Sequence, residues 1–297
     1  MNRRTALKMT AAAGVAAFVA PNVALANEDG LTWTHFPAGE TGFYRAPVLV
    51  SGPTEAVLID GGFTLSDGQA LAEAIKSTGK TLTTIYVSQS DPDFYFGLRP
   101  IVEAFPEARV IAASETVAAI NANVAKKVET WGPQLGENGP QSVDDVVMPD
   151  VDDSTTLIVD GYKLDIVPAA GFANRRYIWS EDLQAVFGGV MVFSGTHVWL
   201  ADTQTKEERA AWIANLDAII ARAPQIVVSG HMTPDAPLGL ESVAFTKAYL
   251  LAVEDELAKA TTSEELNAAM RARYPELGMG MALDIGAKVL TGEMKWG

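Results

Sequence analysis

The chain has 297 residues, of which 48% are hydrophobic, and a formal net charge of −15 at pH 7. This hydrophobic content is ample for a buried core, and a chain of this length forms one large domain or two small ones. The acidic balance argues against nucleic acid and anionic lipid as partners. The sequence has no cysteine and three histidines, which excludes disulfides and thiolate ligands and leaves few imidazoles for zinc.

The first 26 residues have the pattern of an export signal. The pair Arg3-Arg4 precedes the apolar run 11–20, and Ala24-Leu25-Ala26 has the small residues that a signal peptidase recognises. We therefore predict a twin-arginine signal over residues 1–26 and a periplasmic mature protein over 27–297. Cleavage removes three cations and no acid, so the charge becomes −18. The run is too short for a stable transmembrane helix and no second one follows, so we expect a soluble protein without membrane attachment after cleavage. An uncleaved anchor is the alternative.

The first half of the mature chain begins with strands and then alternates helices with strands. Apolar segments separated by Gly and Pro turns predict consecutive antiparallel strands over 31–36, 43–50 and 56–60. A helix from a Ser66 cap to a Gly79 stop follows. The next predicted elements are a strand over 83–88, a helix near 98–105, a strand over 109–113 and a helix over 114–131. The polar segment 132–153 predicts a long surface loop, either a lid over a cleft or a disordered insertion.

A second series of strands and helices follows this loop. We predict strands over 155–160, 163–168, 175–180, 184–193 and 225–229. Thr205 and Glu208 form a capping box before a helix over 206–223, and further helices are predicted over 241–260 and up to about 273. Strands followed by helices, twice over, favour an α/β (α+β) fold with two mixed sheets between outer helices. We treat residues 27–297 as one domain in which the helices from about 241 to 297 are a C-terminal extension.

Three motifs give the sequence a specific resemblance. They are Val57-Leu58-Ile59-Asp60-Gly61-Gly62, the segment from Tyr86 to Gly97 with Gln89-Ser90-Asp91-Pro92-Asp93-Phe94 inside it, and the turn Ser229-Gly230-His231. Together they resemble the metallo-β-lactamase superfamily, in which an Asp-Gly-Gly strand end precedes a helix and the next strand ends in His-x-His-x-Asp-His. The resemblance covers roughly residues 31–235 and implies an αββα sandwich related to zinc-dependent hydrolases.

Most of the metal ligands that this resemblance implies are replaced. The family has histidines or a bridging aspartate at the positions of Gln89, Asp91, Phe94, Phe172 and Gly189. Only Asp93 and His231 keep the family's residue types. Phenylalanine and glycine side chains offer no donor, and a zinc ion with two protein ligands would be held weakly and would not reliably activate water. We therefore expect the two-zinc reaction to be lost, and whether the protein is an enzyme stays open.

Two functions from different classes remain. In the first, the protein is a metal-free binding or regulatory relative that holds a small-molecule ligand in the old cleft. The cleft would be lined by Asp60, Phe94, Tyr95, Phe172, Gly189 and His197. In the second, it hydrolyses a small ester, lactone or amide through a remodelled mononuclear site. The residues of that site would be Asp91, Asp93 and His231, with Gln89 as a further donor, around one weakly held Zn, Mn or Fe ion.

The same polar residues allow simpler roles. Asp91, Asp93 and His231 are candidate catalytic residues, and the two aspartates could work as an acid–base pair without metal. Asp93 and His231 could instead only hydrogen-bond each other and the neighbouring backbone. The adjacent Arg175 and Arg176 either meet an anionic ligand or face solvent. The sequence identifies neither the substrate nor the oligomeric state.

Overall fold

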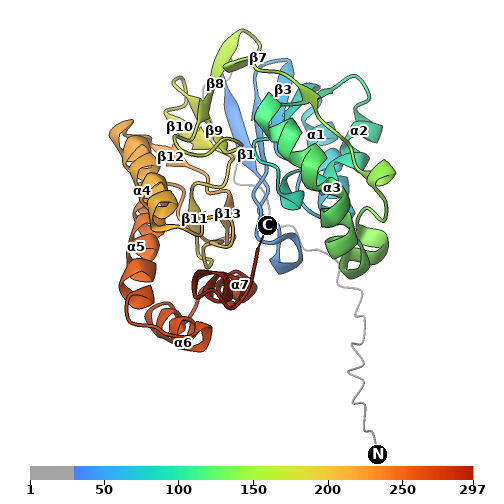
Figure 1. Cartoon of the computed structure of the whole chain (residues 1–297). Coiled ribbons are helices and arrows are strands. Elements are labelled where there is room, and N and C mark those ends of the chain that lie inside the picture. The colour runs from blue at the N-terminus through green and yellow to red at the C-terminus, as the bar shows by residue number, and fades with distance from the viewer. Residues whose placement is uncertain (1–29, 297) are drawn as a thin grey trace, which may run out of the picture.

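The structure is a computed structural model and describes residues 30–296 of the chain. The predicted export signal, residues 1–26, lies outside the described residues. Two mixed sheets lie in the middle of the described part, with helices on their outer sides, as Figure 1 shows. The predicted layered fold class is therefore confirmed. Within residues 30–296, no helix combines the length and the apolar character that crossing a bilayer requires.

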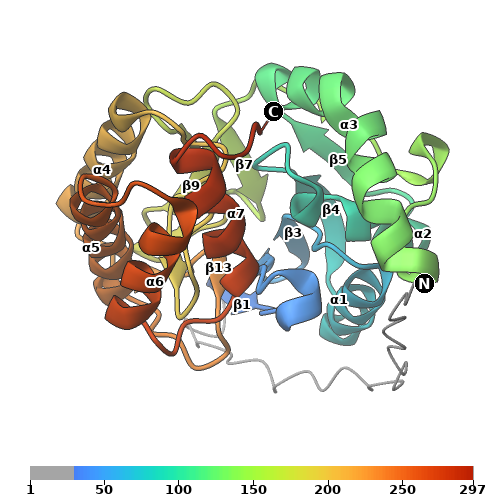
Figure 2. The same cartoon turned by 60° about the horizontal axis from the view of Figure 1, so that its bottom comes forward.

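The first sheet has six strands in the order β1-β2-β3-β4-β5-β6. They are β1 (Thr32–His35), β2 (Val48–Ser51), β3 (Glu55–Ile59), β4 (Thr81–Tyr86), β5 (Arg109–Ala112) and β6 (Asp150–Val151). The first three pair antiparallel, as predicted, and β3 to β6 pair parallel. The parallel strands are joined through α1 (Leu65–Thr78), α2 (Arg99–Ala104) and α3 (Ser114–Leu135), which lie together on one side of the molecule (Figure 2).

The second sheet has five strands in the order β12-β10-β9-β8-β7. They are β7 (Thr156–Val159), β8 (Tyr162–Pro168), β9 (Arg176–Ser180), β10 (Ala185–Phe187) and β12 (Ile226–Val227), and a small separate sheet pairs β11 (Phe193–Ser194) with β13 (His231–Met232). The helices of this half are α4 (Lys206–Ala221), α5 (Leu240–Leu257), α6 (Ser263–Arg273) and α7 (Gly280–Leu290). The single strand predicted over 184–193 is wrong, because Gly188 and Gly189 adopt φ of 68° and 71° and turn the chain there.

Alternating side chains of the strands build two hydrophobic cores. On β3, Val57 and Ile59 belong to the core between the two sheets, whereas Ala56 and Leu58 belong to the core under the helices. This alternation follows from the period of two residues along an extended strand. The core between the sheets also contains Trp33 from the first sheet and Phe187 from the second. The two sheets are thereby held face to face, and their strand ends meet along one edge.

Capping residues set the limits of the helices. The N-cap of α1 is Thr64 and not Ser66, because the Thr64 hydroxyl accepts from the Asp67 amide and the Asp67 carboxylate accepts in return. Gly79 ends α1 in the left-handed conformation with φ of 67°, as predicted. The predicted capping box that starts at Thr205 also forms at the beginning of α4.

The segment 132–153 is folded against the first half of the molecule. Helix α3 continues to Leu135, two short 3-10 turns follow, and β6 then pairs with the edge strand β5. Arg99 of α2 donates from Nε to the backbone oxygen of Asp145 at 2.9 Å and from Nη2 to that of Asp144 at 2.8 Å. None of the residues 132–153 lines the two clefts described below. This segment is therefore neither a lid over those clefts nor a disordered insertion.

Candidate functional site

Two adjoining clefts open between the two halves of the molecule. The first, which we call the aromatic pocket, has a volume of about 40 Å³ and is lined by rings together with Asp91, Asp93, Lys127 and His231. The second, which we call the polar cleft, has a volume of about 540 Å³ and is lined mainly by polar and charged side chains. Both are lined by Asp91, Lys127, Trp131 and Trp296, so the two clefts adjoin each other.

Asp93 and His231 come together in the aromatic pocket. His231 Nε2 lies 3.3 Å from Asp93 Oδ2, and His231 Nδ1 lies 2.8 Å from the backbone oxygen of Phe43. Because a carbonyl oxygen only accepts, Nδ1 carries the proton of the neutral ring and Nε2 keeps its lone pair. Asp93 Oδ2 has no hydrogen-bond partner of good geometry. A carboxylate oxygen and an imidazole lone pair thus face each other across a gap that a proton can bridge.

Burial shifts the pKa values of this pair in opposite directions. Burial raises the pKa of Asp93 to about 7, the nearby Asp91 adds to the rise, and Arg45 and Lys127 oppose it. Burial lowers the pKa of His231 to about 3, and the positive charge of Arg45 acts in the same direction. At pH 7 the imidazole is therefore neutral, and Asp93 is divided between its two protonation states. The protonated carboxyl is the form that can donate to His231 Nε2.

Asp91 is engaged elsewhere. Its Oδ1 pairs with Lys127 Nζ at 2.9 Å, and its Oδ2 accepts from Gln89 Nε2 at 2.8 Å. Burial acts to lower the pKa of Lys127, but Asp91 raises it on balance, which keeps the lysine charged. The side-chain oxygen of Gln89 accepts from the Ser90 amide at 2.8 Å. The side-chain oxygens of Asp91 and Gln89 that could bind a metal ion thus already accept hydrogen bonds within the protein.

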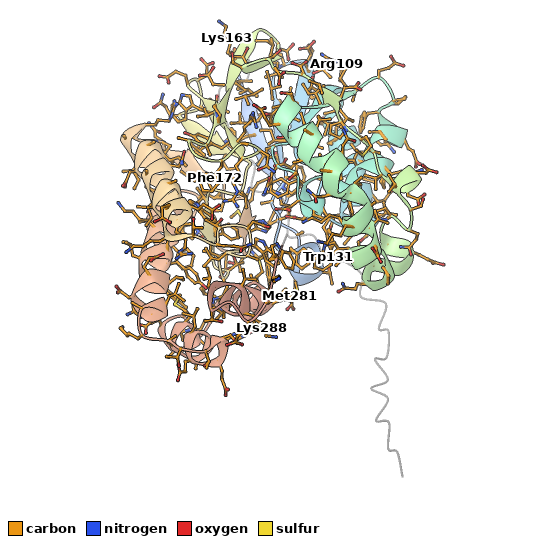
Figure 3. The ribbon with its side chains drawn as sticks, viewed as in Figure 1. Arg109, Trp131, Lys163, Phe172, Met281 and Lys288 are labelled. Atoms are coloured by element: carbon orange, nitrogen blue, oxygen red, sulfur yellow. The ribbon has the colours of Figure 1, made fainter. Side chains whose placement is uncertain are left out.

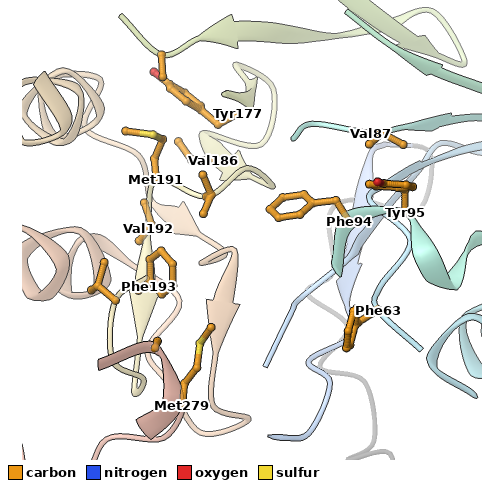
Figure 4. Close-up of a cluster of buried hydrophobic side chains, with 14 of the residues drawn as sticks. Phe63, Val87, Phe94, Tyr95, Tyr177, Val186, Met191, Val192, Phe193 and Met279 are labelled. Atoms are coloured by element: carbon orange, nitrogen blue, oxygen red, sulfur yellow. The ribbon is translucent and has the colours of Figure 1, made fainter. Parts of the chain in front are cut away.

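Arg45, which the sequence analysis did not single out, is completely buried among the predicted ligand positions. Its guanidinium pairs with Asp60 and donates to the backbone oxygens of Gly230 and, at 3.2 Å, Gly189. Its central carbon lies 3.8 Å from the centroid of the Phe94 ring. Figure 4 shows this ring reaching from the loop after β4 toward the second sheet. A permanent positive charge is therefore placed against residues 94 and 189.

Asp60 holds this cation. It adopts φ of 65°, a left-handed conformation that aspartate tolerates better than most residues, and it accepts from the Ser88 amide at 2.8 Å and the Ser88 hydroxyl at 2.9 Å. Burial raises the pKa of Asp60, while Arg45 and the Ser88 donors act against that rise. Because its oxygens are bound by Arg45 and Ser88, Asp60 positions the guanidinium and is not available to a ligand.

The residues present do not fit a two-zinc centre. Across residues 30–296, no three His, Cys, Asp or Glu side chains gather closely enough to hold a metal ion. A Cβ at Gly189 would lie 2.2 Å from the backbone oxygen of Arg176, so the backbone excludes an aspartate there. The fixed charge of Arg45 also repels any second cation nearby. A reaction at two zinc ions therefore has no support in the residues present at this site.

The predicted lining residues divide into two groups. Phe94 lines the aromatic pocket and Phe172 lines the polar cleft, whereas the other four, Asp60, Tyr95, Gly189 and His197, line neither. Asp60 and Gly189 are covered by Arg45, and Tyr95 is buried with its ring centroid 5.2 Å from that of Phe96. His197 lies in the core, where its Nδ1 is 2.9 Å from the Tyr249 hydroxyl and burial lowers its pKa to about 4.

Aromatic residues from distant parts of the chain form the wall of the pocket. The ring centroid of Phe43 lies 4.7 Å from that of Phe63 and 5.3 Å from that of Trp131. On the opposite side, Trp199 and Trp296 form an edge-to-face pair with centroids 5.3 Å apart. Figure 3 shows Trp131 on the α3 side and Phe172 on the other half. No spacing in the sequence marks these rings, because each lies on a different element.

The C-terminal segment closes this wall. The indole N–H groups of Trp199 and Trp296 both donate to the Asp202 carboxylate, at 2.6 Å and 2.7 Å, and Gln204 Nε2 donates to the backbone oxygen of Trp296 at 3.1 Å. The segment after α7 thus runs back between the two halves (Figure 1). It has the covering position that the sequence analysis had considered for segment 132–153.

Comparisons with known proteins identify the architecture. No family model matches the chain, and no curated protein matches its sequence. The crystal structure of the metallo-beta-lactamase family protein TTHA1429 from Thermus thermophilus is similar over 89% of this chain and 93% of its own, with 18% identity and a TM-score of 0.59. The structure of VMB-1 is similar over 79% of this chain and 98% of its own, with 17% identity and a TM-score of 0.51. The chain therefore has the fold of the metallo-β-lactamase superfamily.

Proposed function

We propose that this protein is an exported, periplasmic binding relative of the metallo-β-lactamase-fold hydrolases, which holds a small organic molecule and does not perform the two-zinc reaction. The observation that carries the proposal is the position of the Arg45 guanidinium. It stacks on Phe94 and binds the backbone of Gly189, at two positions where the resembling family has metal ligands. A cation of the protein itself thus takes part of the space and charge of the metal centre.

The character of the cavity supports binding. Its inner part, the aromatic pocket, is walled by six aromatic side chains, namely Phe43, Phe63, Phe94, Trp131, Trp199 and Trp296. Its outer part, the polar cleft, offers hydrogen-bonding and charged groups. The polar cleft has a volume of about 540 Å³, which is within the range of small-molecule sites. Rings that enclose a site free of strong nucleophiles contribute ligand affinity through apolar burial and do not activate water.

A hydrolase with a rebuilt site is the second candidate, and the contact between Asp93 and His231 favours it. A carboxyl with a pKa near 7 that faces an imidazole lone pair at 3.3 Å has the properties of a general acid–base pair. A mononuclear metal site would in addition need Asp91, which would have to leave Lys127. Metal-free acid–base chemistry is therefore the form of this candidate that needs less rearrangement.

Two measurements on the mature protein, residues 27–297, separate the candidates. The first is the metal content after expression with added Zn²⁺, Mn²⁺ or Fe²⁺, for which we expect a stoichiometry near zero. The second is turnover of small esters, lactones and amides by the wild type, by His231→Ala and by the surface variant Arg109→Gln, which leaves both clefts intact. We expect no turnover above background in any of them. Turnover that His231→Ala abolishes and Arg109→Gln preserves would favour the hydrolase.

A further inference from the structure

Arg175 is a buried cation without a carboxylate partner in the wall of the polar cleft. Its side chain belongs to a residue only 4% exposed, and its Nη2 donates to the Asp202 backbone oxygen at 3.2 Å and to Thr203 Oγ1 at 3.0 Å. Its guanidinium carbon lies 4.5 Å from the Phe172 ring centroid and 5.2 Å from that of Trp212. In the part of the chain that the structure describes, Nη1 has no hydrogen-bond partner.

The neighbouring arginine makes the contrast clear. Arg176 forms an ion pair with Glu115, with Nη2 and Oε2 2.8 Å apart. Arg175, which is 4% exposed against 8% for Arg176, stacks on rings and donates only to neutral oxygens. A buried charge normally has a counter-charge, because desolvating it alone is costly. Asp202, Asp91 and Glu208 act on the charge of Arg175 only from beyond ion-pair distance, so an anion in the cleft that Arg175 lines can supply the direct partner.

We propose that Arg175 anchors an anion subsite, and that the molecule held in the cleft is a small organic monocarboxylate whose apolar part enters the aromatic pocket. This inference rests on the proposed binding function and names its ligand class. The planar guanidinium matches a carboxylate geometrically and remains charged at any physiological pH. Further donors line the same cleft on Asn123, Asn174 and Lys127.

The acidic residues of the cleft favour a single negative charge over a phosphate group. Asp91, Asp202 and Glu208 all line the polar cleft. Asp91 is paired with Lys127, Asp202 accepts from two indole N–H groups, and Glu208 accepts from the Thr205 amide at 2.9 Å at the start of α4. The negative charges of these three residues lie in the same cleft as Arg175, so they would repel a dianion more strongly than a monocarboxylate.

The geometry of the two clefts supports an apolar part on the same ligand. Trp131 and Trp296 line both clefts, so the cleft with Arg175 lies next to the ring-walled pocket. A carboxylate at Arg175 would orient the ligand, and burial of its apolar part against the rings would supply much of the affinity. A molecule with only one of these two features would use the polar cleft or the much smaller aromatic pocket, but not both.

The test compares acids with neutral isosteres of the same shape. The probes are phenyl-terminated carboxylates from phenylacetate to 6-phenylhexanoate, each with its primary amide and its amine, titrated calorimetrically into wild-type protein without added metal. We expect at least one acid to bind about tenfold or more tightly than its amide, since hydrogen bonds to an ionised group are the stronger ones. The corresponding amine should bind less tightly than the amide.

Three variants assign the preference to Arg175. The ratio of amide to acid dissociation constants should fall to about one in Arg175→Gln and be partly kept in Arg175→Lys. It should be unchanged in the control Arg109→Gln, whose side chain is 62% exposed and pairs with Asp152 outside both clefts. If circular dichroism shows that Arg175→Gln does not fold, the test depends on Arg175→Lys and on the difference in affinity between acid and amide in the wild type.

Each failure has its own signature. Equal binding of acid and amide, or an unchanged ratio in Arg175→Gln, overturns the anion subsite and leaves the binding function in place. Tighter binding of an amine than of its acid also overturns it. Absence of binding by every acid at millimolar concentration likewise overturns the anion subsite. Failure of the proposed function itself is recognised by metal-dependent or His231-dependent turnover in the separate assay.

Discussion

The guanidinium carbon of Arg45 lies 3.8 Å from the ring centroid of Phe94, in a site from which solvent is excluded. The same guanidinium pairs with Asp60, so the ring of Phe94 and the carboxylate of Asp60 are connected through one cation. A desolvated cation–π contact contributes about 2 kcal/mol. Phe94, Arg45 and Asp60 are therefore parts of one buried cluster.

Removal of Arg45 should destabilise the protein strongly. Arg45→Met leaves the buried Asp60 without its counter-charge, and we expect the free energy of unfolding to fall by about 3–5 kcal/mol. Urea denaturation followed by fluorescence measures the change. The double variant Arg45→Met with Asp60→Asn should recover part of the loss, because no charge is left unpaired. A single-variant loss below about 1 kcal/mol, the size expected for an exposed pair, would contradict this account.

The raised pKa of Asp93 gives a signed pH dependence. Its folded pKa of about 7 lies above the unfolded value, so the folded state binds the proton more tightly and stability is lost as pH rises toward 7. The lowered pKa of His231 acts oppositely between about pH 3 and 6.5, and the two effects partly cancel in the wild type. Asp93→Asn removes only the first effect.

We therefore expect Asp93→Asn to gain stability relative to the wild type as pH rises from 5 to 8, by about 2 kcal/mol. Urea denaturation curves of both proteins at the two pH values provide the measurement. Asp217→Asn, on the exposed pair with Lys247, serves as a control and should show a much smaller difference. A stability difference that does not change with pH would show that Asp93 is ionised in the folded protein at both values.

Restoring the family's bridging aspartate should fail at Gly189. Gly189 has φ of 71°, and a Cβ there would approach the Arg176 backbone oxygen to 2.2 Å. Gly189→Asp should therefore cost about 3 kcal/mol or more and bind no metal. The control is Gly161→Ala, where φ is 83° but no atom lies within 4 Å of the added Cβ. Its cost should stay near 1 kcal/mol, and equal costs would remove the steric argument.

Trp296 should control access to the aromatic pocket. Trp296→Ala removes the ring that packs on Trp199 and the N–H that binds Asp202. We expect acrylamide quenching of the remaining tryptophans to increase and the affinity for the best phenyl carboxylate to fall about tenfold, because a contact wall is lost. Met281→Ala on α7, half-exposed and outside both clefts, should change neither. Unchanged quenching would place Trp296 outside the closed wall.

Export should depend on the arginine pair near the start of the chain. Replacement of Arg3 and Arg4 by lysine keeps the charge but removes the twin-arginine pattern, so the protein should stay in the cytoplasm with its first 26 residues. Fractionation and N-terminal sequencing of the wild type should give a periplasmic protein that begins at Asn27. Periplasmic recovery of the double variant would contradict the twin-arginine route.

Local patterns were enough for the elements and for the family resemblance. The apolar run of β3 and the caps at Gly79 and Thr205 depend on neighbouring residues, which a sequence displays directly. The sequence-based predictions were wrong where packing against distant residues overrides the local pattern. Residues 184–193 have the composition of one strand, but the chain turns at Gly188 and Gly189, where an added Cβ would collide with Ile59 or with the Arg176 backbone.

The sequence by itself determined the order of most strands and helices and the layered fold class, and it singled out positions such as 94 and 189. Only the tertiary structure decided what surrounds those positions. Arg45 meets Gly189 from 144 positions away and Gly230 from 185, and Arg175 remains unpaired while Arg176 finds Glu115. Such contacts depend on how two sheets close on each other, and the periodicity of a single segment carries no information about a partner so far along the chain.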